Sequence, residues 1–108
     1  VWGTGKPKRE FMHVDDLTDA ISFLINKNEF SKTLLNVGSN EEVSIIELVE
    51  IIKKIIGYKG TVVFDNTKPD GNPKKLLDSS QINSLGWKPK IKLEEGIRSV
   101  YDWYSRKY

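Results

Sequence analysis

The stretch Arg9-Glu10-Phe11-Met12-His13-Val14-Asp15-Asp16 marks the point where a loop becomes a strand and the strand becomes a helix. Its first six residues alternate Arg, Phe and His with Glu, Met and Val, which is the two-residue period of a β-strand. Apolar residues then recur at helical spacing, at Leu17, Ala20, Ile21 and Leu24. Asp15 or Asp16 is placed to cap that helix. The stretch therefore predicts a strand over residues 9–14 and a helix over residues 16–26.

The residues before this stretch are turn formers and cations. Gly3, Gly5 and Pro7 favour a loop. The loop carries the indole of Trp2 and the cations Lys6, Lys8 and Arg9. An aromatic ring and a group of cations presented from an anchored strand–helix unit are typical of a binding site.

Composition limits the possible functions. The 108 residues include 17 Lys and Arg against 15 Asp and Glu, a net charge of +2, with no cysteine. One domain is expected. The chain has no run of basic residues interleaved with aromatics, which is the pattern that would indicate nucleic-acid binding. The absence of cysteine excludes disulfides and thiolate metal sites and is compatible with a reducing compartment. Every apolar run is shorter than the ~20 residues of a membrane span. A chain that opens on Val1 without Met is expected to be part of a longer protein.

The whole chain reads as strands alternating with helices, followed by a long loop and two helices. Ser44 and Glu47 match a capping box, and Gly57 is a helix terminator. The expected elements after the first helix are a strand over 33–37, a helix over 44–57, a strand over 61–64, a loop over 65–75, a short helix from 79 or 80 to 85 and a helix from 93. The fold class is therefore α/β with some parallel strand pairing.

Both early helices are more apolar than one small sheet requires. The helix over 44–57 has a wide apolar face, which predicts cover on two sides. The first helix carries Phe23 and Ile25 outside its main apolar stripe. We therefore expect a neighbouring segment or chain to cover part of this surface.

The usual catalytic patterns are missing or incomplete. Gly3-Thr4-Gly5 lacks the third glycine of a dinucleotide fingerprint and leads into Lys-Pro, so it reads as a turn. His13 has no Ser, Cys or second His at useful spacing, and a hydrogen-bonding histidine is favoured over a catalytic one. Asp15 and Asp16 read as helix-start charges, not as a metal pair. We expect no self-contained active site, bound cofactor or metal in these residues.

A recognition surface is the remaining possibility. Arg9 offers a fork of donors suited to a diphosphate, and Lys74 and Lys75 add charges from a loop bounded by prolines. Trp2 offers a flat face for a base or sugar, and Asp70 can accept from ribose hydroxyls. The equally weighted alternative is that the lysines are ordinary solvated charges and Trp2 is an aromatic at a chain end.

Several motifs resemble the extended short-chain dehydrogenases that act on nucleotide sugars, in the NAD-dependent epimerase/dehydratase family. They are Arg9–Asp16, Asn36–Ser39, Gly86–Pro89 and Leu93–Ile97. A narrower set resembles the GDP-L-fucose synthases within that family. It consists of Val1–Gly5, Gly57–Gly60, Phe64-Asp65 and Lys68–Asp78.

The resemblance implies that residues 1–108 form a small C-terminal GDP-sugar-binding domain of a cytoplasmic, homodimeric enzyme. A preceding Rossmann domain would bind NADP(H) and carry the catalytic residues, so the isolated chain is expected to be inactive. The reaction implied is epimerisation of GDP-4-keto-6-deoxy-D-mannose at C3 and C5 followed by reduction at C4. Trp2, Arg9 and Lys75 match substrate-contacting residues of the family, and Asp70 is added by analogy with related epimerases. His13 does not match the catalytic histidine.

Two other readings remain open. The chain could belong to an epimerase or dehydratase that acts on a different nucleotide sugar. It could also be a non-catalytic binding or interaction module.

Overall fold

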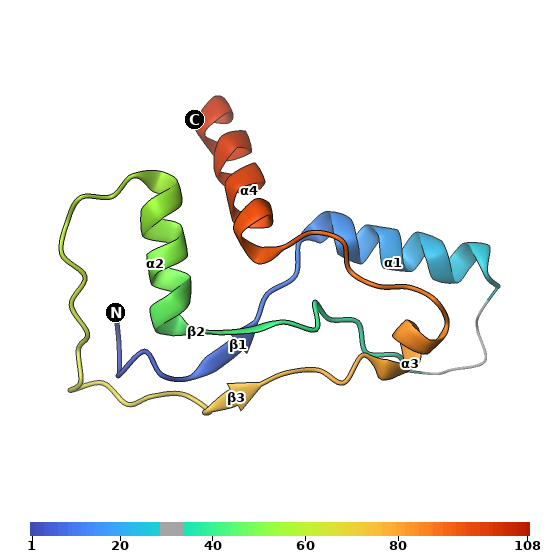
Figure 1. Ribbon diagram of the computed structural model, residues 1–108, viewed down its shortest axis with the longest axis horizontal. Coiled ribbons are helices and arrows are strands. Elements are labelled where there is room, and N and C mark those ends of the chain that lie inside the picture. The colour runs from blue at the N-terminus through green and yellow to red at the C-terminus, as the bar shows by residue number, and fades with distance from the viewer. Residues whose placement is uncertain (29–33) are drawn as a thin grey trace.

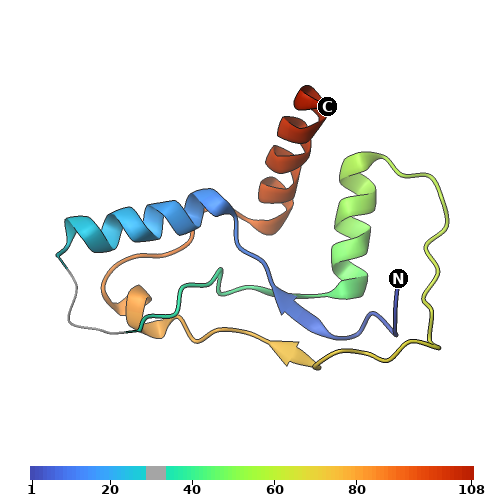
Figure 2. The same cartoon turned by 180° about the vertical axis from the view of Figure 1, so that it is seen from behind.

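The computed structural model describes residues 1–28 and 34–108, and in these ranges it contains a three-stranded sheet and four helices. The elements in chain order are β1 (Lys8–Glu10), α1 (Val14–Asn26), β2 (Glu42–Ser44), α2 (Ile45–Ile56), β3 (Lys74–Lys75), α3 (Ser80–Ser84) and α4 (Leu93–Lys107). Figure 1 and the view from behind in Figure 2 show α2 and α4 standing side by side, with α1 running lengthwise. The predicted α/β fold class and the order of the helices are confirmed, whereas β2 and β3 lie where no strand was predicted, β3 within the predicted loop over 65–75.

The sheet has the order β2-β1-β3, so the stretch that begins at Arg9 supplies its central strand. β1 pairs antiparallel with β2 and parallel with β3, which confirms the expected parallel pairing. β1 is shorter than predicted and ends at Glu10, because His13 already begins the helix.

Two predicted strands are not found among the described residues. Residues 34–37 form no strand, and Thr33 and most of the polar link before it lie outside the described residues. The Glu10 carboxylate accepts from the Asn40 amide at 2.9 Å and fills the space beside Gly38, so pairing with β1 starts only at β2. Residues 61–64 also form no strand, since their neighbour is the short N-terminal segment, and the only bridge there joins Trp2 to Asp65.

The first turn of α1 corrects the predicted cap. The cap is His13, whose Nδ1 accepts from the Asp15 amide at 3.1 Å, and not Asp15 or Asp16. Asp16 is 2% exposed, and its two carboxylate oxygens accept from the backbone amides of Lys90 and Ile91, each at 3.0 Å. The two adjacent aspartates therefore have different roles. Asp15 faces solvent, whereas Asp16 ties α1 to the segment before α4.

Asp19, one turn further along α1, holds the same segment. It accepts from the Trp87 indole Nε1 at 2.8 Å and from Lys90 Nζ at 3.1 Å. These hydrogen bonds, first that of Trp87 and then that of Lys90, lower the pKa of Asp19 below its usual 3.8. Trp87 is 3% exposed and packs with Ala20 and Ile82 as the buried apolar core of the described residues.

The caps of α2 agree with the sequence. The Ser44 hydroxyl accepts from the Glu47 amide at 3.2 Å, and the Glu47 carboxylate accepts from the Ser44 amide at 2.8 Å. Gly57 ends the helix with φ 69°, which is in the left-handed region that a glycine adopts without steric cost. The expected cover on two sides is not seen, since no residue of α2 is fully buried.

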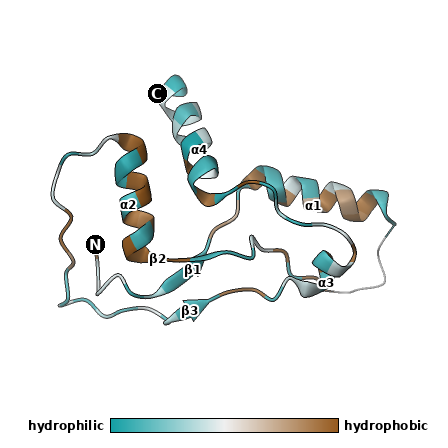
Figure 3. Ribbon diagram, in the orientation of Figure 1, coloured by the Kyte–Doolittle hydropathy of each residue, from teal (hydrophilic) through white to brown (hydrophobic). Residues whose placement is uncertain are grey.

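Much apolar surface stays exposed. Phe23, predicted to lie off the main stripe of α1, packs against the core, whereas Leu17 and Ile21 of the predicted stripe are 41% and 49% exposed. Figure 3 shows the hydrophobic positions along α1 and α2. The radius of gyration is 16.6 Å, against about 13 Å for a compact domain of this length. The shape is therefore more open than that of a self-sufficient domain.

Among the described residues, none of the helices combines the length and the apolar character needed to cross a bilayer.

Replacing Asp16 tests the tie between α1 and the segment before α4. We expect Asp16→Asn to lower the free energy of unfolding by about 1.5–3 kcal/mol, because one of two buried amides loses a charged acceptor. Asp15→Asn is the matched control, since that side chain is 75% exposed; its loss should stay below about 1 kcal/mol. Urea unfolding followed by circular dichroism measures both, and equal losses would contradict the assignment.

Candidate functional site

Two segments far apart in sequence run side by side and form the site. The Val1 amino group donates to the Val63 carbonyl at 2.9 Å, and the Gly3 amide donates to the Asp65 carbonyl at 2.9 Å. Further along, the Lys8 amide donates to the Pro73 carbonyl at 2.8 Å, where β1 meets β3. Residues 1–9 and 63–75 therefore form one surface, and the four predicted substrate contacts all lie on it.

The strand register sorts the cations of this surface into two groups. Lys8 pairs with Lys74 and Arg9 with Lys75, and successive side chains of a strand point to opposite faces. On the first face Glu42 lies 3.4 Å from Lys8 Nζ and 3.3 Å from Lys74 Nζ. Partial desolvation raises the pKa of Glu42, but the two ammonium groups outweigh it and lower the pKa below 4.5.

Arg9 and Lys75 form the second group, on the opposite face. In the part of the chain that the structure describes, neither makes an ion pair with a carboxylate. This face therefore carries two adjacent positive charges that are not neutralised by the described residues.

The guanidinium of Arg9 is held in place by backbone carbonyls. Its Nη1 donates to the carbonyl of Lys8 at 2.6 Å and to that of Asn72 at 2.7 Å. A Cβ on Gly71 would lie 3.0 Å from Nη2, so the glycine permits this close approach. Because an arginine has five donors, the group is aimed by the protein and still has donors left for a ligand.

Asp70 contacts the glycine turn of the N-terminal segment. Its Oδ1 accepts from the Thr4 amide at 2.8 Å, and its Oδ2 accepts from the Thr4 hydroxyl at 2.7 Å. These hydrogen bonds, the one from the hydroxyl first, hold the pKa of Asp70 below its usual 3.8. Gly3, at φ 77°, would place a Cβ only 2.2 Å from Asp70 Oδ1. The turn is thus fitted to the carboxylate and is not merely flexible.

Trp2 is an exposed ring next to this turn. It is 76% exposed, and Lys68 Nζ lies 5.6 Å from the ring centroid, within cation–π range. The indole is therefore presented to solvent on the surface formed by residues 1–9 and 63–75.

Sequence reasoning missed Thr4, Glu42 and Asn72 as parts of this surface. Thr4 carried a signal, since a hydroxyl between two glycines can hydrogen-bond a facing acidic loop. Glu42 and Asn72 carried none, because one acts across the sheet and the other acts through its backbone carbonyl.

His13 has a structural role, as the sequence favoured. Its Nε2 lies 3.0 Å from Ser99 Oγ, and its Nδ1 caps α1. A Cβ on Gly96 would lie 3.2 Å from the His13 ring, so glycine lets α4 approach. No group of three or more potential metal ligands occurs among the described residues.

Comparison with known proteins gives this surface a context. The model of the NAD dependent epimerase/dehydratase family matches residues 1–38. A probable GDP-L-fucose synthase 1 from Oryza sativa subsp. japonica is 53% identical over 104 residues, which cover 96% of this chain and 31% of the relative. The GDP-L-fucose synthase of Escherichia coli K12 is 43% identical over 112 residues, which cover 96% and 35%.

The chain resembles one third of a GDP-L-fucose synthase. Solved structures agree. A GDP-6-OMe-4-keto-L-xylo-heptose reductase from C. jejuni has a TM-score of 0.89 at 40% identity and covers 100% of this chain and 34% of that one. A GDP-L-fucose synthetase from Naegleria fowleri bound to NADP has a TM-score of 0.89 at 25% identity, with coverages of 100% and 34%. The GDP-L-fucose synthase resemblance inferred from the sequence is confirmed.

The Gly3-Thr4-Gly5 turn does not have the form of a dinucleotide-binding turn. Gly5 leads through Pro7 into β1 and not into a helix, and the first amides of α2, those of Ile45 and Ile46, already donate to the carbonyls of Pro7 and Gly5 at 3.1 and 3.0 Å.

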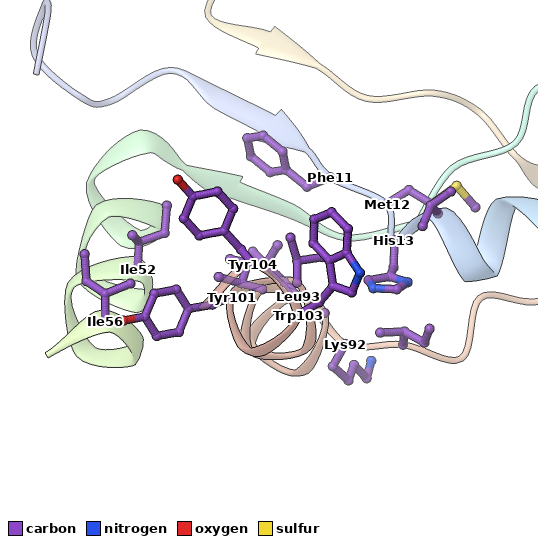
Figure 4. Close-up of a pocket in the computed structure, with 15 residues that line it drawn as sticks. Phe11, Met12, His13, Ile52, Ile56, Lys92, Leu93, Tyr101, Trp103 and Tyr104 are labelled. Carbon is purple, nitrogen blue, oxygen red and sulfur yellow. The ribbon is translucent and has the colours of Figure 1, made fainter. Parts of the chain in front are cut away.

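The main apolar groove lies elsewhere. It has a volume of about 500 Å³ and lies between α2, α4 and the turn before α1 (Figure 4). Tyr101, Trp103 and Tyr104 of α4 line it together with Ile52 and Ile56 of α2. None of the four predicted substrate contacts lines this groove. It fits an apolar partner surface better than a charged nucleotide sugar.

The hydrogen bonds of Asp70 predict a pH dependence. Because its folded-state pKa is lowered, its stabilising effect is present at neutral pH and is lost as the pH falls through that value, below 3.8. In an NMR titration, the Asp70 carboxyl and the Thr4 amide should share a midpoint below 3.8. Thr4→Val should move the carboxyl midpoint back up. A wild-type midpoint at or above 3.8 would contradict the hydrogen-bonded geometry.

Proposed function

We propose that this chain is the GDP-sugar-binding part of an NADPH-dependent GDP-4-keto-6-deoxy-D-mannose 3,5-epimerase-4-reductase, the activity of a GDP-L-fucose synthase. The observation that carries the proposal is the pairing of Arg9 with Lys75 on the face opposite Glu42. Two cations left without a carboxylate partner among the described residues are suited to a diphosphate.

The substrate contacts follow from the chemistry of the side chains. The Arg9 fork and the Lys75 ammonium bind the diphosphate through charge-assisted hydrogen bonds, which contribute roughly 1.5–3 kcal/mol each. Trp2 stacks on the base or the sugar through its exposed ring. Asp70, predicted as a ribose contact by analogy with related epimerases, lies on the same surface, where both of its oxygens already accept hydrogen bonds from Thr4.

This assignment divides the work between two parts of the enzyme. Binding of the remote GDP half positions the sugar for chemistry performed by another domain. That domain, a Rossmann domain, holds NADP(H) and the catalytic residues, and it covers the apolar groove between α2 and α4. It also accounts for the open shape of the chain, whose helices would otherwise leave apolar side chains in water. The homodimer and the cytoplasmic location implied by the resemblance remain predictions.

Two alternatives are an enzyme that acts on a different nucleotide sugar and a non-catalytic interaction module. A solved structure similar to this chain is that of a reductase acting on a GDP-heptose, so GDP as the nucleotide is better supported than the identity of the sugar. A different nucleotide-sugar epimerase or dehydratase would prefer another nucleotide over GDP. A non-catalytic interaction module would bind no nucleotide and would use the apolar groove.

The Arg9 and Lys75 variants test the site. We expect Arg9→Ala or Lys75→Ala to weaken binding of GDP or a GDP-sugar by about 1–3 kcal/mol, or roughly 5- to 150-fold, because each removes charged hydrogen bonds to phosphate. Calorimetric titration of the chain or of the complete enzyme measures the change.

Lys74→Ala is the matched control. Lys74 lies in the same two-residue strand as Lys75 but pairs with Glu42 on the other face, so GDP affinity should change less than twofold. Unchanged affinity in both the Arg9 and Lys75 variants would remove the site assignment. A preference for UDP or dTDP would favour the alternative substrate class.

The division of labour predicts inactivity of the 108 residues alone. Given NADPH and GDP-4-keto-6-deoxy-D-mannose, the chain should oxidise no NADPH above a buffer control, whereas the complete Escherichia coli relative should do so. Absorbance at the NADPH band follows the reaction. Measurable turnover by the chain would overturn the proposal that its catalytic residues lie outside it.

A further inference from the structure

We infer that Thr4 and Asp70 form a latch that fixes the Trp2 turn against the Pro69–Lys75 loop, so that both residues are positioning residues for nucleotide binding. The inference rests on the proposed function and deepens it. It also gives Asp70 a role that acts through Thr4 and not by direct contact with ribose.

The latch joins segments that lie 66 residues apart. Thr4 donates from both its amide and its hydroxyl, and it occupies both oxygens of one carboxylate. Gly3 takes a positive φ and has no Cβ where Asp70 Oδ1 sits, so the turn accepts the carboxylate only with a glycine there. Gly3 and Thr4 are thereby explained as the receptor for the Asp70 carboxylate.

The latch lies between the proposed substrate contacts. Trp2 comes two residues before Thr4, and Asn72, whose carbonyl holds Arg9, comes two residues after Asp70. Gly71, directly after Asp70, leaves room for Arg9 Nη2. Fixing Thr4 to Asp70 therefore ties the backbone that carries the indole to the loop whose Asn72 carbonyl holds the guanidinium.

The described loop has few other ties to the N-terminal segment. Asp65 bonds to Val1 and Gly3, and the hydrogen bonds of Thr67 and Lys68 stay within the loop at Asp65. Beyond Asp65, the Lys68 ammonium lies 5.6 Å from the Trp2 ring centroid, and apart from the latch the next hydrogen bonds across are those of Asn72 and Pro73. Residues 66–72 are all exposed, so water competes for the latch and an open form is accessible. A ligand that contacts both Trp2 and Arg9 binds only the latched form. When the latch is lost, the apparent affinity for the ligand falls in proportion to the fraction of molecules that still have the closed arrangement.

The test compares Thr4→Val with Thr4→Ser in GDP titrations of the 108-residue chain. We expect Thr4→Val to weaken GDP binding about 3- to 10-fold, as loss of one hydrogen bond implies, and Thr4→Ser to stay within about twofold of wild type. Asp70→Asn should weaken GDP binding similarly. The double variant Thr4→Val/Asp70→Asn should lose no more than about the larger single effect, because both changes break one interaction.

The same set separates the latch from a direct ribose contact. If Asp70→Asn weakens binding while Thr4→Val leaves it unchanged, Asp70 acts on the nucleotide itself and the latch is overturned. If Asp70 acts through the latch, Asp70→Asn should weaken the binding of 2′-deoxy-GDP by the same factor as the binding of GDP. A smaller loss of affinity for 2′-deoxy-GDP would also overturn the latch.

Failure of the latch is distinguishable from failure of the proposed function. If the wild-type chain binds no GDP, the proposed function fails and the latch falls with it. If the wild type binds and Lys75→Ala weakens binding but Thr4→Val does not, only the latch fails. The circular dichroism spectrum of Thr4→Val, expected to match wild type, and a cooperative unfolding transition show that a loss of affinity does not come from a loss of fold.

Discussion

The buried carboxylate of Asp16 is the constraint on which the rest of the chain depends. At 2% exposure it must find donors, and it finds them in the amides of Lys90 and Ile91. That choice brings the residues before α4 onto α1, where Asp19 and Trp87 complete the contact. α4 then starts beside His13. The sequence motifs at the two ends of the chain are therefore one packed unit, and the strand that precedes α1 is aimed by it.

The candidate site depends on the register of the short parallel pairing between β1 and β3. A shift of β3 by one residue relative to β1 would place Lys75 instead of Lys74 on the face of Glu42 and would leave Lys74 beside Arg9. The pairing is brief, but the Lys8 amide to the Pro73 carbonyl and Arg9 to the Asn72 carbonyl fix its register. Charge sorting is thus a result of backbone geometry, and it separates lysines that are adjacent in sequence.

The two surfaces of the molecule suit different partners. The cationic face with Trp2 is polar and open, whereas the groove between α2 and α4 is lined by aliphatic and aromatic side chains. The chain matches about a third of its relatives' length, and its radius of gyration of 16.6 Å reflects an open shape. Both surfaces are therefore accessible on the same chain. Polar recognition and apolar docking can then be altered separately, because no predicted substrate contact lines the groove.

The sequence by itself determined what depends on local chemistry. Local chemistry explains the capping box of α2, its glycine terminator, the start of α4 and the order of the helices, and these were predicted correctly. The motifs also identified the family resemblance. Only the tertiary structure decided which aspartate is buried, which face of α1 meets the core and which lysine Glu42 neutralises. It likewise removed the strands predicted over 33–37 and 61–64 from the described residues, since a strand needs a partner and β-propensity supplies none. These outcomes depend on contacts between residues 30 or more positions apart, which no local pattern encodes.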